Sequence, residues 1–418
     1  MNETPASTEP ASADRHAAAL LFGHWVSTLG SRLFFVAVAW FLTVELGVAA
    51  SSWALALFQF LPVVVMMPIT LAIVDVVGRR RVVLLSDAIR ASICLAGALL
   101  ATLGHVALGL LSAVLIVRLF DTLYAPSIRA GVTEAAGRFG KLSPQYVLLL
   151  VSSSASLLAP LLVPAATTLP VSLVLVVNAA TYLASLAGCL FGGRLLDNDA
   201  ADPVRLGAAL KRWRISIREG WTALTGVAVL RRVVPTLPCI DMAYAALVVV
   251  LPAIAMRASQ GDSGWLYALL VLIYGACRIL GAEIGRRLIH GRRDGVLLAV
   301  NCSAQGILYM VAGVSGGSWF FVVAVALIGM LSGATTLSVN EIVGDVIQPQ
   351  LRGRVFALIG FAVVTFIPFG PALSGLASGA SPTLTLLIVG GLLTTVGLSP
   401  LLSRTVWRFD SMRAAASP

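Results

Sequence analysis

The sequence predicts an all-α polytopic membrane protein, with twelve transmembrane helices arranged as two six-helix pseudo-repeats. The first observation is composition: the 418 residues are 58% hydrophobic and only 11% charged, whereas soluble domains are about 25% charged. The second is length, because a spanning helix needs about 20 apolar residues and such stretches recur along the chain. The third is an uneven distribution of basic residues. Together these observations exclude a water-soluble globule.

Arginine clusters and short Gly, Ser and Pro turns separate twelve apolar stretches, each long enough to cross the hydrocarbon core. We place them at residues 18–44, 50–74, 82–103, 106–127, 144–168, 170–193, 232–256, 263–285, 295–314, 317–344, 353–377 and 382–403. The polar start of the chain lacks the basic and apolar pattern of a secretory signal, so no cleaved signal peptide is expected.

The basic residues indicate how these spans are oriented. Twenty-four of the 29 Lys and Arg residues lie in the tails and in every second loop, whereas only Arg257 lies in the alternate loops. Because basic loops stay in the cytoplasm, we expect a multi-pass protein of the inner (plasma) membrane with both termini cytoplasmic. The formal net charge of +10 therefore reflects topology, and no nucleic-acid partner is expected.

A polar segment divides the chain into two halves of six spans. The predicted parts are a cytoplasmic tail at 1–17, an N-terminal six-helix bundle at 18–193, a linker at 194–231, a C-terminal six-helix bundle at 232–405 and a cytoplasmic tail at 406–418. The linker has apolar residues at steps of three and four, which predicts an amphipathic helix: Leu206, Leu210, Trp213, Ile217, Trp221 and Leu224. This helix lies either on the inner membrane surface or on the protein's own inner loops.

The two halves repeat each other. Ala159-Pro160 in the fifth span and Gly370-Pro371 in the eleventh are 211 residues apart, and the same shift superimposes Arg81 on Arg292. Two bundles with corresponding features are typical of transporters built from parallel repeats, whose binding site lies between the halves near the membrane midplane.

The loop after the second span resembles the loop motif GxLaDrxGrkr of the major facilitator superfamily. The matching residues are Asp75, Gly78, Arg79, Arg80 and Arg81, with Leu71 and Val76 at positions where that motif has glycine and arginine. Glycine permits a tight turn between helices, and an aspartate at a helix end can meet the dipole of a neighbouring helix. The resemblance implies a contact that latches one conformation of a transporter.

Two further segments resemble the exporter members of this superfamily. The helix-bending motif GxxxGPxxGG of proton-driven exporters is similar to the fifth and eleventh spans, at Pro160, Pro164, Gly370, Pro371 and Gly375. The segment 348–354 is similar to the P-x-x-R-G-R sequence of macrolide and siderophore exporters. The resemblance therefore implies a drug:proton antiporter.

Several ionisable residues lie inside predicted spans, where each costs at least about 2.5 kcal/mol. The family fold implies that the first, fourth, seventh and tenth spans line the central cavity. Candidate cavity charges and proton-coupling groups are Arg32, Arg118, Asp121, Asp241, Arg278 and Glu341. A cavity with the three arginines would suit an anionic solute.

Three of these acids are candidate proton carriers, ranked Asp241, Asp121 and Glu341. Desolvation penalises the charged form of a buried carboxylate, which is the property a carrier needs. Asp241 has no basic residue nearby on its own helix, and its alternative is capture by an arginine of another span. Asp121 lies three residues after Arg118 and can form a structural ion pair with it. For Glu341, contact with inner-loop arginines is the alternative.

We interpret the sequence as a secondary active transporter that works by alternating access and exports an amphipathic small molecule, such as a drug, antibiotic or siderophore-like metabolite, against proton entry. Import of an anionic metabolite and a non-transport, lipid-handling or binding role are the alternatives. Expected partners are the substrate, the bilayer and protons, and the protein is expected to act as a monomer. No phosphate-binding loop, nucleophile with a base, or metal-ligand spacing is present in the sequence, so no enzyme, cofactor or metal is expected.

Overall fold

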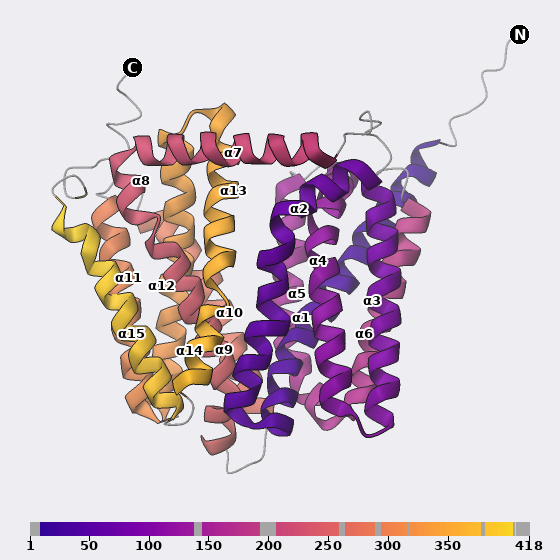
Figure 1. Ribbon diagram of the computed structural model, residues 1–418, viewed down its shortest axis with the longest axis horizontal. Helices are drawn as coiled ribbons and strands as arrows, with labels where there is room; N and C mark the ends of the chain where they lie inside the picture. Colours follow the sequence, from indigo (N-terminus) through magenta and orange to yellow (C-terminus); the bar gives the residue numbers. More distant parts are fainter. Residues whose placement is uncertain are drawn as a thin grey trace, which may run out of the picture. The chain divides into compact units, whose positions relative to one another are not determined.

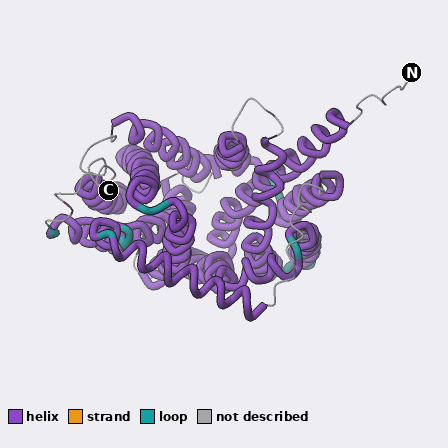
Figure 2. Tube along the Cα trace, turned by 90° about the horizontal axis from the view of Figure 1, so that it is seen from above, coloured by secondary structure: helices purple, strands orange, loops and turns teal. Residues whose placement is uncertain are grey.

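The computed structural model describes residues 9–137, 144–192, 206–258, 264–288, 294–316, 318–377, 381–403 and 406. Almost all of these residues are helical, and the described part of the chain contains no strand (Figures 1 and 2). The prediction of an all-α membrane fold is confirmed.

The first half of the chain follows the predicted spans closely. Its elements are α1 (Glu9–Ala54), the π-helical turn η1 (Leu55–Phe60), α2 (Leu61–Val77), α3 (Arg79–Thr102), α4 (Val106–Gly137), α5 (Pro144–Thr168) and α6 (Val171–Gly192). The long helix α1 contains a kink at Gly47, where φ is 76°. Only glycine adopts this conformation without strain, so the first two predicted spans are joined by a bend rather than by a loop.

The second half begins with the linker helix and continues with six spans. Its elements are α7 (Leu206–Gly226), α8 (Ala228–Val233), α9 (Thr236–Ala258), α10 (Gly264–Leu288), α11 (Asp294–Ser315), α12 (Trp319–Val346), α13 (Pro349–Phe366), α14 (Phe369–Ala377), α15 (Pro382–Leu398) and η3 (Ser399–Leu402). The predicted eleventh span is thus interrupted between α13 and α14. Pro368 and Pro371 lie at this break, and a proline removes a helical backbone donor.

Eleven helical segments of the described residues are long and apolar enough to cross a membrane. The remaining predicted span corresponds to α5, whose apolar helical part, Leu157–Thr168, is shorter than in the other spans. Large apolar side chains are exposed along these helices, including Leu99 at 61%, Phe191 at 70% and Val314 at 70%. Apolar surface of this extent is stable against lipid rather than water.

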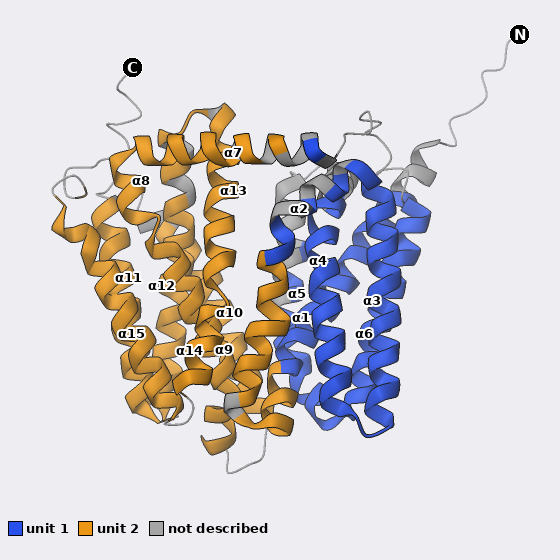
Figure 3. Cartoon of the chain, viewed as in Figure 1, with its two compact units in different colours: residues 1–38, 65–210 blue, residues 39–64, 211–418 orange. Residues whose placement is uncertain are grey.

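The chain folds into two compact units, coloured separately in Figure 3. Unit 1 consists of residues 1–38 and 65–210, and unit 2 consists of residues 39–64 and 211–418. The end of the first span and the start of the second therefore belong to unit 2. There, Trp40 stacks on Tyr267 with ring centroids 6.0 Å apart, and Gly375 of α14 lies against the indole of Trp53.

Small residues bring the helices of each unit into close contact. In unit 1, α3 and α4 pack at Gly97 and Gly109, where a Cβ added to either glycine would come within 2.7 Å of the other's carbonyl oxygen. In unit 2, α10 and α12 pack in the same way, with Gly281 against the backbone of Met330. Because lipid provides no hydrophobic driving force between helices, close packing of small residues stabilises such interfaces.

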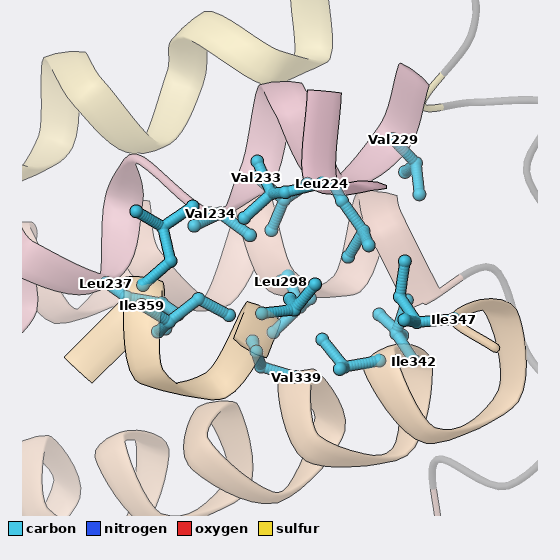
Figure 4. Close-up of a cluster of buried hydrophobic side chains, with 14 of the residues drawn as sticks. Leu224, Val229, Val233, Val234, Leu237, Leu298, Val339, Ile342, Ile347 and Ile359 are labelled. Carbon is cyan, nitrogen blue, oxygen red and sulfur yellow. The ribbon is translucent and has the colours of Figure 1, made fainter. Parts of the chain in front are cut away.

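The linker forms the amphipathic helix α7, whose apolar stripe divides between two environments. Leu224 is 5% exposed and joins a buried cluster with α8, α9, α11, α12 and α13, and Ile217 packs against this cluster (Figure 4). Trp221, from the same predicted stripe, is 59% exposed. Glu219 forms an ion pair with Arg354 of α13. One face of α7 therefore packs on unit 2, while Trp221 stays outside.

Candidate coupling and substrate-binding groups

Unit 1 contains an arginine between two aspartates. Arg90 of α3 forms ion pairs with Asp87, one turn earlier, and with Asp121 of α4, whose Oδ1 lies 2.5 Å from Nη1. The side chains of Arg90 and Asp87 are 1% and 0% exposed, and that of Asp121 is 22% exposed. Charges inside a membrane need such partners, because unpaired ones are costly.

Two tyrosine rings complete the surroundings of Arg90. Its guanidinium carbon lies 4.1 Å from the ring centroid of Tyr124 on α4 and 4.5 Å from that of Tyr182 on α6. The Tyr124 hydroxyl hydrogen-bonds Ser185 at 3.0 Å, and the Tyr182 hydroxyl hydrogen-bonds Ser31 at 3.1 Å. We call Asp87, Arg90, Asp121, Tyr124 and Tyr182 the Arg90 cluster. It holds α3, α4 and α6 together through charge-assisted and cation–π contacts.

The pairing of Asp121 differs from the one that helical spacing suggests. Among the described residues, the ion-pair partner of Asp121 is Arg90 and not Arg118. The guanidinium of Arg118 lies over the ring of Phe35, 3.4 Å from its centroid, and its buried Nε has no hydrogen-bond partner in the described part of the chain. Arg118 interacts electrostatically with both Asp121 and Arg32.

Unit 2 contains a looser group of charges. Asp241 of α9 is partly buried and interacts electrostatically with Arg278 of α10, but within the described residues it forms no direct ion pair. The rings of Tyr244 and Tyr274 stack nearby with centroids 4.4 Å apart. The Tyr274 hydroxyl donates to Ser332 at 3.3 Å. We call Asp241, Arg278, Tyr244 and Tyr274 the Asp241 cluster.

The loop motif is a tight turn between α2 and α3. Gly78 has φ 89° and precedes the first turn of α3, which begins with Arg79, Arg80 and Arg81. A positive φ is accessible to glycine and strained for a branched residue, so the structure explains the glycine of this motif. Asp75 lies in α2, but its side chain is outside the described residues, as is that of Glu341 in α12.

The helix-bending residues lie within helices or at their ends. Pro160 and Pro164 are inside α5. Gly370 of α14 packs against the backbone of Met242 on α9, the residue next to Asp241. Pro371 follows Gly370 in α14. Gly370 therefore allows α14 to pack closely against α9, the helix that carries Asp241.

Sequence reasoning missed Asp87 and Arg90 as a site. The available signal was an aspartate and an arginine three residues apart inside an apolar span, a spacing that places both on one helix face. No group of His, Cys, Asp or Glu in the described residues is placed to hold a metal ion.

No protein-family model matches the sequence, and no curated protein matches it significantly. Solved structures do match. A POT peptide transporter in complex with sulfate has a TM-score of 0.69 and 13% identity, covering 93% of this chain and 94% of its own. The chain has the major facilitator fold. The nucleoside transporter NupG has a TM-score of 0.65 and 14% identity, over 93% of this chain and 99% of its own.

The human organic anion transporter MFSD10 (TETRAN) has a TM-score of 0.62 and 15% identity, over 93% of this chain and 99% of its own. At such low identities the likeness concerns the fold. It extends over nearly the whole of each chain, so the chain carries both halves of that fold.

Proposed function

We propose that the protein is a secondary active transporter that works by alternating access and exports an amphipathic small molecule against proton entry. The observation that carries the proposal has two parts. The fold is similar to solved structures of a peptide, a nucleoside and an organic anion transporter, and the spans of both units contain charged side chains. Charges at membrane depth are costly, and they are typical of substrate and proton pathways.

Proton coupling is supported by the Asp241 cluster. Asp241 is partly buried and Arg278 is near, but within the described residues no direct ion pair fixes its charge. A carboxylate in this environment can bind a proton in one conformation and release it when a cation approaches. Asp121 ranks below Asp241 because it is already paired with Arg90.

Export is supported by sequence motifs, namely the prolines and glycines of the fifth and eleventh spans and the segment 348–354. We also propose that the protein acts as a monomer in the inner membrane. Both termini and the α7 linker lie in the cytoplasm in this proposal, because the tails and loops on that side carry most of the basic residues.

Transport of an anion is the second candidate, and one observation favours it. The predicted spans 18–44, 82–103 and 106–127 carry Arg32, Arg90 and Arg118 against Asp87 and Asp121, an excess of one positive charge among these five groups. An anionic substrate would offset that excess inside the membrane.

Flux into vesicles tests the proposal. Purified protein is reconstituted into vesicles loaded at acid pH, and the uptake of fluorescent naphthalenesulfonate and naphthyltrimethylammonium is followed with and without a protonophore. The orientation of the protein is determined with the variant Arg214→Cys. An impermeant thiol reagent labels this cysteine only where the cytoplasmic face of the protein is on the outside of the vesicle. We expect uptake of at least one probe that collapses with the protonophore. Uptake driven only by the opposite gradient would make the protein an importer, and flux independent of any gradient would contradict secondary active transport.

A further inference from the structure

We propose that Arg32 and Arg118 together bind the oxyanionic group of a singly charged amphipathic substrate within the spans of unit 1. The inference rests on the proposed transport function and names the substrate class. Four structural observations carry it: the course of α1 beside α4, the pairing of Asp121, the unsatisfied nitrogen of Arg118 and the charge balance of the ionisable groups in these spans.

Arg32 of α1 lies close to Arg118 of α4 in the fold. Arg32 and Phe35 are three residues apart on α1 and therefore share a face of the helix. Phe35 lies directly under the guanidinium of Arg118, at 3.4 Å, so this face of α1 is turned toward Arg118. The two arginines interact electrostatically, and that interaction between like charges is unfavourable.

The carboxylate nearest to Arg118 is already engaged. Oδ1 of Asp121 accepts a hydrogen bond from Nη1 of Arg90 at 2.5 Å, and Arg90 also pairs with Asp87. The Arg90 cluster thus uses both aspartates of the unit's spans for one arginine. Asp121 still acts electrostatically on Arg118, but the buried Nε of Arg118 has no hydrogen-bond partner in the described part of the chain.

The chemistry of this pair indicates its ligand. A guanidinium presents planar, forked donors that match carboxylate, sulfonate or phosphate oxygens better than a spherical halide. Among Arg32, Arg90, Arg118, Asp87 and Asp121 the excess of positive charge is one, so a single negative charge balances it. The site is lined by Phe35, which packs with Phe34 at a centroid distance of 5.6 Å, and such surroundings suit the apolar body of an amphipathic anion.

Binding to the full-length protein in detergent tests this inference. The thermal unfolding midpoint is measured against increasing naphthalenesulfonate, naphthyltrimethylammonium and inorganic sulfate. We expect naphthalenesulfonate to stabilise the wild type and the cationic probe to have no effect. Arg118→Gln should bind naphthalenesulfonate at least about tenfold more weakly, since a charge-assisted contact is lost. Arg118→Lys keeps the positive charge but lacks the forked donors of arginine. Its affinity for naphthalenesulfonate should therefore lie between that of the wild type and that of Arg118→Gln.

Arg257→Gln is the matched control, because it removes one positive charge from an exposed position at the end of α9, and it should bind as the wild type does. Arg32→Gln provides a second test should Arg118→Gln fold poorly, and it should weaken binding as well. Equal stabilisation of wild type and both glutamine variants, or equal stabilisation by the cationic probe, would overturn the inference. Stabilisation by sulfate alone would overturn the amphipathic substrate class.

The flux measurement separates this inference from the proposed function. Gradient-driven uptake of the cationic probe, without binding or uptake of the sulfonate, would leave transport standing and remove the anion site. Arg118-dependent binding of the sulfonate without flux of either probe would leave the site standing and contradict transport.

Discussion

The two units handle charge inside the membrane in different ways. In unit 1, Arg90 is enclosed by two carboxylates and two tyrosine rings and is almost fully buried. In unit 2, Asp241 is partly buried, with Arg278 near but not directly paired in the described residues. A group whose partners are fixed stabilises a bundle, whereas a group with a loose partner can change its charge as the protein moves. This difference supports our proposal that the Arg90 cluster stabilises unit 1 and that the Asp241 cluster couples protons.

Substitution of the two arginines should show the largest contrast. Arg90→Ala leaves the buried carboxylate of Asp87 and the partly buried one of Asp121 without their cation, and breaking a buried pair costs about 3–5 kcal/mol. We expect little folded protein, measured as the yield of monodisperse material and its thermal unfolding midpoint. Arg278→Gln removes a charge that has no direct ion pair among the described residues, and it should keep most of the wild-type yield. Equal losses of yield would remove the difference between the clusters.

Helix packing should show no contrast, because both units use the same device. Gly109→Leu in unit 1 and Gly281→Leu in unit 2 each place a side chain against a neighbouring backbone, and overpacking costs about 1–3 kcal/mol. We expect similar drops in the thermal unfolding midpoint for both variants. The control is Gly391→Leu in α15, since nothing lies within 4 Å of a Cβ there. A marked effect at one site only would show that the units differ in packing as well as in charge.

The α2–α3 turn should affect rate more than stability. Gly78 and Gly104 both have a positive φ, 89° and 90°, so valine at either position imposes a backbone strain of about 1–3 kcal/mol. Gly78 belongs to the loop motif, whereas Gly104 lies in the turn between α3 and α4. We expect both valine variants to lose some stability, but of the two only Gly78→Val should transport more slowly into vesicles. Asp75→Asn, in the same loop motif, should also slow transport. Wild-type rates in Gly78→Val at equal expression would exclude the turn from the mechanism.

The sequence predicted the spans well because hydrophobic length and basic loops are local properties. The kink at Gly47 and the break between α13 and α14 were harder to predict, since glycine and proline are common in spanning helices and only some of them bend the chain. The apolar stripe of α7 could be recognised in the sequence. Which of its residues pack against the protein depends on where α12 and α13 lie, and this could not be predicted.

The charged residues could be found in the sequence, but their partners could not. Arg118 and Asp121 share a helix face, which suggests that they pair. Asp121 instead forms its ion pair with Arg90 of α3, because α3 and α4 pack closely at Gly97 and Gly109. Likewise, the proximity of Arg278 to Asp241 arises from the packing of α9 and α10. Such contacts join residues far apart in the chain, and no local pattern encodes them.

The central claim is that protons are coupled through Asp241, and transport by Asp241→Asn in vesicles tests it most directly. Without a carboxylate at this position, pH-driven uptake should be lost, whereas substrate binding and substrate-driven exchange, which need no net proton movement, should remain. Asp121→Asn should lower the yield of folded protein, but the protein that folds should keep pH-driven uptake. Full pH-driven uptake by Asp241→Asn would contradict the account.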